Sequence, residues 1–145
     1  MNVYSFLNVS CLIAGPGIVA NLAAGAAAAE EGITITPGSD KNEMMIGADG
    51  KGQHSLIADD SAHILIHLLK TSPFNALLML AYDLQTSSSA LHGQNVITVI
   101  DSARVDLHVL QSVAFKKKPE IGYKKVAGMM IWEFDVIKAS SVLGA

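Results

Sequence analysis

The segment MMIGADGKGQHSL, residues 44–56, decides between two kinds of fold. Its glycines, aspartate and lysine could form a phosphate-binding loop between a parallel strand and a helix, which would place the chain among the α/β proteins. The spacing does not fit, because such a loop needs four residues between its glycines and a serine or threonine after its lysine. Asp49-Gly50 instead favours the tight turn of a β-hairpin, since glycine adopts positive φ without strain. We therefore predict a hairpin that projects from the domain at about residues 47–60.

Strand-like patterns lie on both sides of this turn. In the last apolar segment, Met130, Trp132, Phe134 and Val136 alternate with polar residues, which is typical of a strand with one buried face. The Ala-rich stretch 23–32 has no clear apolar face, so it is either a loop or a close-packed strand of small residues. The predicted strands are 3–13, 18–23, 33–36, 42–48, 61–70, 95–101, 105–115 and 128–139.

The strand predicted at 105–115 also alternates along its whole length. The inward set in this prediction is Val105, Leu107, Val109, Val113 and Phe115, and the outward set is Asp106, His108 and Ser112.

One segment has the period of a helix. Ser72 and Pro73 form a typical helix start, and apolar residues then recur at helical spacing as far as Tyr82. We predict a helix at about 72–85 that packs one face on a sheet. The fold class is therefore mainly β, an antiparallel β-sandwich or barrel with one flanking α-helix, in a single domain over 1–145.

Composition limits the possible functions. The chain has a formal net charge of −3, which argues against a protein that neutralises duplex DNA. Only 16% of the residues are charged and half are apolar, which leaves apolar surface for a partner, including further copies of the chain. The single cysteine, Cys11, excludes an internal disulfide and a cysteine zinc site, and we expect it to be a small buried residue in a reducing compartment.

The N-terminal region is apolar but does not match a targeting segment. No lysine or arginine precedes Lys41, so the positive region of a secretory signal is missing. The turn at residues 15–17 interrupts the apolar run before it reaches the length of a spanning helix. We expect no membrane anchor.

The search for catalytic and metal sites finds weak candidates. His63 and His67 would share one face of a strand but lie about 13 Å apart, too far to bind one metal ion directly. We favour a structural or interface role for them; a small metal-dependent enzyme or ligand-binding barrel that uses this face stays open as an alternative. Ser87–Ser89 lack a nucleophile elbow, and Cys11 has no basic neighbour in sequence. We expect no catalytic, cofactor-binding or metal-binding residue.

The lysines at 116–118 and 124–125 form the only positive cluster of the sequence. They could meet phosphates, but a solvated connection is the commoner meaning of such a run. The same cluster could instead be one half of a charge-complementary interface with acids on another subunit.

Six segments follow one another along the chain: EEGITI, DKNEMMIGADGKGQHSL, LLKTSPFNALL, HGQNVITVID, VAFKKKPEIGY and GMMIWEFDVI. Together, and over nearly the whole chain, they resemble the small tail tube proteins of contractile-tailed bacteriophages. The sequence departs from the family pattern at the Ala-rich residues 23–29, where more glycine and serine would be expected.

The resemblance implies a structural protein, not an enzyme, with a tail-tube-like β-sandwich and one flanking helix. Six subunits would form a ring, and rings would stack into a hollow conduit for genome ejection inside a contractile sheath. The implied partners are further copies of the chain, the tail sheath protein, and the baseplate or tail-initiator and terminator proteins. DNA would be present only in transit, in a virion tail assembled in the host cytoplasm. A tube of a tailocin or secretion-system syringe, without DNA passage, is the alternative.

The resemblance also implies surfaces for contact with other subunits, and it implies no cofactor. The residues expected at subunit or inter-ring contacts are Gly47, Asp49, Gly50, Lys51, Gln53, His54, Asp59 and Asp60. The acids expected to face the lumen are Glu43, Asp49 and Asp135.

Overall fold

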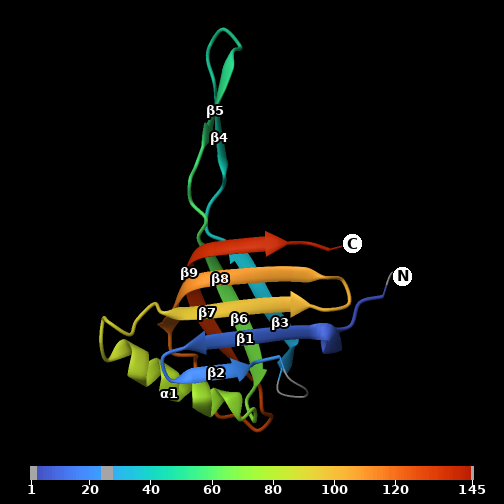
Figure 1. Cartoon of the computed structure of the whole chain (residues 1–145), viewed down its shortest axis with the longest axis vertical. Helices are drawn as coiled ribbons and strands as arrows, with labels where there is room; N and C mark the ends of the chain where they lie inside the picture. The colour runs from blue at the N-terminus through green and yellow to red at the C-terminus, as the bar shows by residue number, and fades with distance from the viewer. Residues whose placement is uncertain (1–2, 24–27, 145) are drawn as a thin grey trace.

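The computed structural model describes residues 3–23 and 28–144, and Figure 1 shows a mainly β fold with one helix. The predicted fold class is confirmed: one large antiparallel sheet dominates, and the helix lies against its side. The elements are a 3₁₀ turn η1 (Phe6–Asn8), β1 (Val9–Gly15), β2 (Ile18–Asn21), β3 (Ala28–Pro37), β4 (Asn42–Ile46), β5 (Gly52–Leu56), β6 (Ala62–Leu69), α1 (Phe74–Thr86), β7 (Asn95–Asp101), β8 (Asp106–Lys117) and β9 (Met129–Val142).

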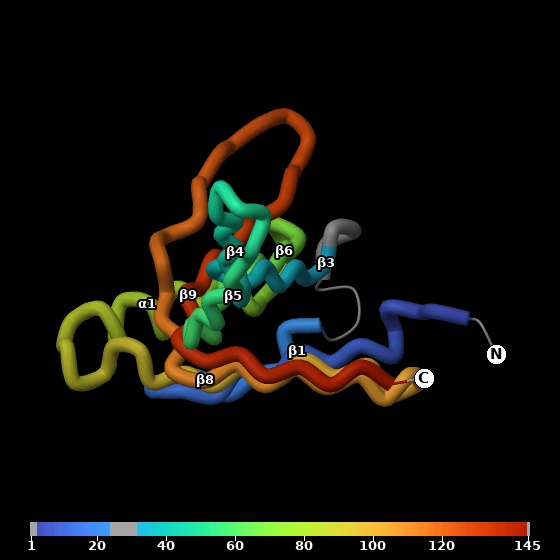
Figure 2. The backbone as a smooth tube through the Cα atoms, turned by 90° about the horizontal axis from the view of Figure 1, so that it is seen from above, coloured from blue at the N-terminus to red at the C-terminus, as the bar shows by residue number. Residues whose placement is uncertain are grey.

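Seven strands form one sheet in the order β2-β1-β7-β8-β9-β6-β3, and β4 and β5 form a separate two-stranded sheet. The long strand β9 joins the two parts of the large sheet. Its residues 129–136 pair with β6, whereas its residues 133–142 pair with β8. Figures 1 and 2 show that β3 and β6 therefore cross over the layer formed by β1, β7 and β8. The sheet thus folds over itself and encloses the core between its two parts.

Aromatic side chains fill the centre of this core. The ring centroid of Phe115 lies 4.7 Å from that of Phe134, 5.9 Å from that of Trp132 and 5.6 Å from that of Tyr82 on α1. Trp132 and Phe134 are fully buried, as the alternation of the last strand predicted. The other large buried side chains include Ile13, Leu22, Ile64, Ile66, Leu68, Leu78, Ile97, Leu110 and Val113.

Two buried amide side chains connect α1 to the sheet. Gln85 and Asn95 are both fully buried. Gln85 Nε2 donates to Asn95 Oδ1 at 2.8 Å and to the carbonyl of Pro16 at 2.9 Å, while Asn95 Nδ2 donates to Gln85 Oε1 at 2.6 Å. Asn95 Nδ2 also donates to the carbonyl of Val113 at 3.1 Å. Gly15 makes room for this group, because a Cβ there would overlap Asn95 Oδ1.

The helix begins close to its predicted position. It spans Phe74–Thr86, and Pro73 already has helical dihedral angles of −66° and −19°. The amide of Phe74 donates to Ser72 Oγ at 3.3 Å, so Ser72 caps the first turn in the way that the sequence predicted. Leu78 and Ala81 are the apolar residues of this helix that are buried in the core.

The inward set predicted for 105–115 is wrong in its first half. Ser112 has φ +54°, and the pairing of β7 with β8 shifts register beside it, which marks a β-bulge. A bulge moves the side chains before it to the other face. Leu110 is therefore the buried residue before Ser112, while Val105 and Leu107 are exposed. Val113 and Phe115, after the bulge, are buried as predicted.

Two more local differences concern the N-terminal half of the chain. The predicted strand 3–13 begins only at Val9, because η1 precedes it and the Ser5 side chain caps that turn. The sequence predicted no strand at 52–56, where the structure has β5. The Ala-rich stretch lies partly outside the described residues; β3 is described from Ala28, and Gly32 within it has φ +61°.

Candidate assembly surface

The hairpin formed by β4 and β5 extends far from the rest of the molecule (Figure 1). Its strands pair in register from Asn42 with Leu56 to Ile46 with Gly52. Every residue of both strands is exposed. A lone two-stranded hairpin is marginally stable in water, so a surface of this kind is expected to be covered by a partner.

The tip is a compact turn, which confirms the interpretation of Asp49-Gly50. The amide of Gly47 donates to the carbonyl of Lys51 at 2.7 Å, and the amide of Gly50 donates to the carbonyl of Gly47 at 3.0 Å. Gly50 has φ +84°, and Asp49 Oδ1 accepts a hydrogen bond from the amide of Lys51 at 3.1 Å. The glycines and the aspartate therefore shape the turn through the backbone, and no phosphate site is needed to explain them.

Polar contacts close the base of the hairpin, and the amide of Ala139 on β9 donates to the carbonyl of Asp60 at 2.9 Å, which ties the base to the sheet. Ser39 Oγ donates to Asp59 Oδ2 at 2.7 Å, and the amide of Ser61 donates to Asp59 Oδ1 at 2.8 Å. Hydrogen bonds from Ser61 and Ser39 lower the pKa of Asp59 to about 2, because they stabilise its charged form. Lys41 pairs with Asp60 beside it, although both side chains are half exposed. The base thus holds a defined orientation for the arm above it.

The two faces of the hairpin differ in character. Residues that pair directly across an antiparallel hairpin point to the same face. One face therefore carries Met44, Ile46 and Leu56 together with Asn42 and His54, whose side chains are 3.1 Å apart. The opposite face carries Glu43, Met45, Gln53 and Ser55. The first face, which we call the apolar hairpin face (Met44, Ile46 and Leu56), is more than half exposed at each of its three members.

The residues predicted for subunit contacts all lie on this arm, but they are spread along its length. Four of them, Gly47, Asp49, Gly50 and Lys51, form the tip. Gln53 and His54 lie on opposite faces of β5, and Asp59 and Asp60 lie at the base. The arm begins earlier than residue 47, since β4 starts at Asn42. The apolar hairpin face was missed, although Met44 and Ile46 lie two residues apart in β4, which puts them on one face.

The three acids predicted for a lumen do not gather at one place. Glu43 lies on β4 and Asp49 at the tip, whereas Asp135 lies on β9. Asp135 Oδ1 is 2.7 Å from Nδ1 of His63, its cross-strand partner on β6. This pair is half exposed on the outer face of β6 and β9.

The histidine pair of the metal hypothesis has two separate environments. His63 contacts Asp135, whereas His67 is buried with Nδ1 2.9 Å from the carbonyl of Gly32. Within the described residues, no group of three or more histidine, cysteine or acidic side chains could hold a metal ion. Burial raises the pKa of the Cys11 thiol to about 12, so this group is not an activated nucleophile. No helix in the described part of the chain is long and apolar enough to cross a membrane.

The described fold is thus a mainly β subunit with a long arm whose two strands are exposed at every residue. The sequence matches the family described as bacteriophage PhiTE tail tube protein over residues 1–144. The chain belongs to this family of phage tail tube proteins. It therefore has a structural role in the tail of the virion, where it assembles with copies of itself and with other tail components. No curated protein matches the chain.

Proposed function

We propose that this chain forms hexameric rings that stack into a hollow tube for genome delivery, inside a contractile sheath. The observation that carries the proposal is the match to a tail tube family over 1–144, which covers the whole described fold. The outer tube surface would contact the sheath protein, and the ends of the tube would contact the baseplate or tail-initiator and terminator proteins. Assembly would take place in the host cytoplasm.

The sheet supports ring formation through its edges. Among the described strands, β2 and β3 are the outermost in the seven-stranded order. Residues 137–142 of β9 lie beyond the part of that strand that pairs with β6. Exposed strand edges invite pairing with other chains, and closure of a ring removes them. Edge-to-edge pairing around six subunits would therefore satisfy these backbone groups.

The hairpin would supply contact between rings. The residues that would contact a neighbouring ring or subunit are Gly47, Asp49, Gly50, Lys51, Gln53, His54, Asp59 and Asp60. Glu43, Asp49 and Asp135 would face the lumen, where acidic groups let DNA slide past without binding. The single domain with a projecting arm is then one repeating unit of the tube.

Sedimentation velocity and native mass spectrometry across a concentration series test the ring. The proposal predicts a hexamer, or stacks in multiples of six, above a threshold concentration. Closed rings of another stoichiometry would contradict the six-fold ring, and a chain that stays monomeric at every concentration would remove the support for self-assembly as the basis of function.

A further inference from the structure

We propose that the groove beneath residues 118–128 is the socket that receives the β4–β5 hairpin of a second copy of this chain. The inference deepens the proposed function and rests on it, because it names the receiving surface for contact between stacked rings. Four observations carry it: the position of the groove, its shape, its apolar lining and its charge.

The groove and the hairpin lie at opposite ends of the molecule. β6 connects the two ends: it starts at Ala62, directly after the hairpin, and ends at Leu69, beside the groove. Its partner strand β9 follows the same axis, with Val136 opposite Ala62 and Met129 opposite Leu69. Eight residues of strand span about 25 Å. In Figure 1 the hairpin points to the top and the connection between β8 and β9 lies at the bottom.

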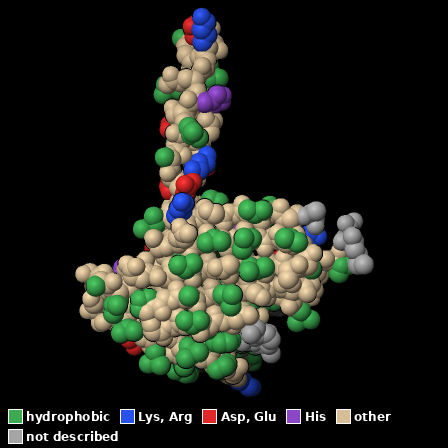
Figure 3. Space-filling view, viewed as in Figure 1, with side chains coloured by type: hydrophobic (Ala, Val, Ile, Leu, Met, Phe, Trp, Pro, Cys, Tyr) green, Lys and Arg blue, Asp and Glu red, His purple; other side chains and the backbone are tan. Residues whose placement is uncertain are grey.

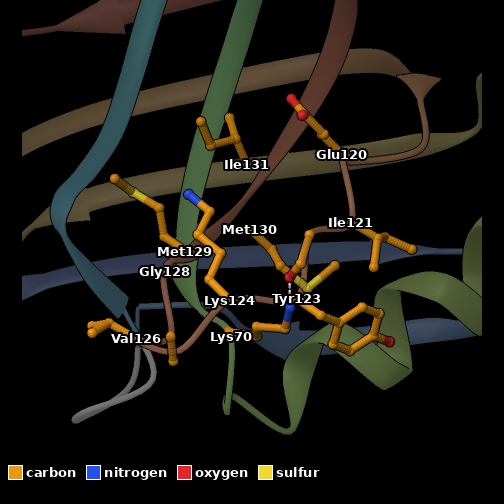
Figure 4. Close-up of a pocket in the computed structure, with 12 residues that line it drawn as sticks. Lys70, Glu120, Ile121, Tyr123, Lys124, Val126, Gly128, Met129, Met130 and Ile131 are labelled. Atoms are coloured by element: carbon orange, nitrogen blue, oxygen red, sulfur yellow. Dashed lines mark hydrogen bonds between the residues drawn. The ribbon is translucent and has the colours of Figure 1, made fainter.

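The groove has room for part of a hairpin. It encloses about 450 Å³ between the connection and the first residues of β9. Its apolar lining includes Ile121, Tyr123, Val126, Met129 and Ile131, all of them at least 39% exposed. Figure 4 shows Met129 and Val126 on one side of the connection and Ile121 and Tyr123 on the other. Exposed side chains of this size in one concave surface are typical of an interaction site.

Lys70 gives the groove a defined shape in the free chain. Its Nζ donates to the carbonyl of Gly122 and lies 4.0 Å from the centroid of the Tyr123 ring. Figure 4 shows this contact between the end of β6 and the middle of the connection. A cation–π contact and a hydrogen bond on one ammonium group restrain the connection, so the socket is largely formed before a partner arrives.

The occupant that fits this groove is the apolar hairpin face. Met44, Ile46 and Leu56 present apolar side chains, of which Met44 is unbranched and flexible, and all three are exposed on one side of a narrow arm. Figure 3 shows charged side chains mainly at the base and the tip of the arm, with mostly hydrophobic and uncharged side chains between them; Glu43 in β4 is on the face opposite the apolar hairpin face. The middle of the arm is therefore the part expected to be buried.

The formal charges of the arm and of the groove favour the same contact and set its direction. Residues 38–61 contain five acids and two lysines, a formal charge of −3, whereas residues 118–128 contain three lysines and one acid, a formal charge of +2. Opposite ends of two copies attract, and like ends repel. Because the arm and the socket are different surfaces at opposite ends of one chain, their contact is head-to-tail and can repeat from one copy to the next along an axis. A stack of rings needs such a contact.

The test is photochemical cross-linking of the full chain at concentrations where it assembles. A benzophenone amino acid replaces Ile46 on the apolar hairpin face, and in a matched control it replaces Met45 on the opposite face. We expect cross-links from position 46 to fall within residues 118–131 of a second copy, and those from position 45 to be largely absent there. Charge reversal gives a second readout: Lys124→Glu with Lys125→Glu should raise the threshold concentration for stacking about tenfold, and an unchanged threshold would contradict the role of charge in this contact.

The possible results test the socket and the proposed tube separately. If tubes form but the cross-links from position 46 fall outside residues 118–131, the socket is wrong and the proposed function stands. The same holds if positions 45 and 46 cross-link to residues 118–131 equally. A chain that neither assembles nor cross-links at any concentration overturns both.

Discussion

The buried amide pair Gln85–Asn95 gives the sharpest stability prediction. Gln85→Met keeps the length and volume of the side chain and its helix propensity, but it removes three hydrogen bonds. It leaves the carbonyl of Pro16 and Asn95 Oδ1 without this partner inside the protein. At about 1 kcal/mol for each lost bond, the free energy of unfolding should fall by about 3 kcal/mol. That is a large part of the stability of an ordinary domain.

Urea unfolding of the monomeric chain measures this loss directly. Trp132, the only tryptophan, is fully buried, so its fluorescence reports the global transition. The midpoint should fall while the slope with denaturant stays unchanged, because the surface exposed on unfolding is nearly the same. Gln111→Met on the exposed face of β8 is the matched control and should change stability by less than about 0.5 kcal/mol. If Gln85→Met and Gln111→Met lower the free energy of unfolding by equally small amounts, the Gln85–Asn95 pair does not hold α1 to the sheet.

Three further predictions concern the arm, its base and the bulge. Leu56→Ser should leave the unfolding transition unchanged but block assembly by sedimentation, whereas Met45→Ser on the opposite face should still assemble; equal effects would contradict the two-faced arm. Because the pKa of Asp59 is lowered from 3.8 to about 2, its carboxylate stabilises the base of the arm above about pH 4. This stabilisation is lost as the pH falls from 3.8 toward 2. NMR should show this carboxyl titrating near pH 2, and a midpoint at the ordinary value would refute the contacts at the base. Ser112→Val puts a β-branched residue at φ +54° and should cost about 1–3 kcal/mol in urea unfolding; no loss would argue against the bulge.

Local patterns in the sequence predicted most of the elements. Alternation placed the buried side of β9, and Ser72 with Pro73 placed the start of α1 within two residues. These predictions succeed because one strand or one turn contains all the information that they need. Asp49-Gly50 predicted the tip of the arm for the same reason.

The rest depends on contacts between distant segments. The bulge at Ser112 follows from the pairing of β7, β8 and β9, and period-two alternation cannot show it. The burial of Gln85 depends on Asn95, ten residues further along the chain, which lies on a different element. The groove at 118–128 looked like a solvated basic connection, because its apolar lining comes partly from β9. Such features depend on which distant segments lie side by side in the fold, and the residue pattern of a single strand or helix does not show this.

The central claim is that the chain forms a tube by stacking rings through its arm. Electron microscopy of the assembled protein, with image reconstruction, tests it most directly. The account predicts rings of six subunits stacked around an open bore, with the β4–β5 hairpin of each subunit crossing into the next ring. Assemblies without a bore, or stacked rings between which the hairpin makes no contact, would contradict it.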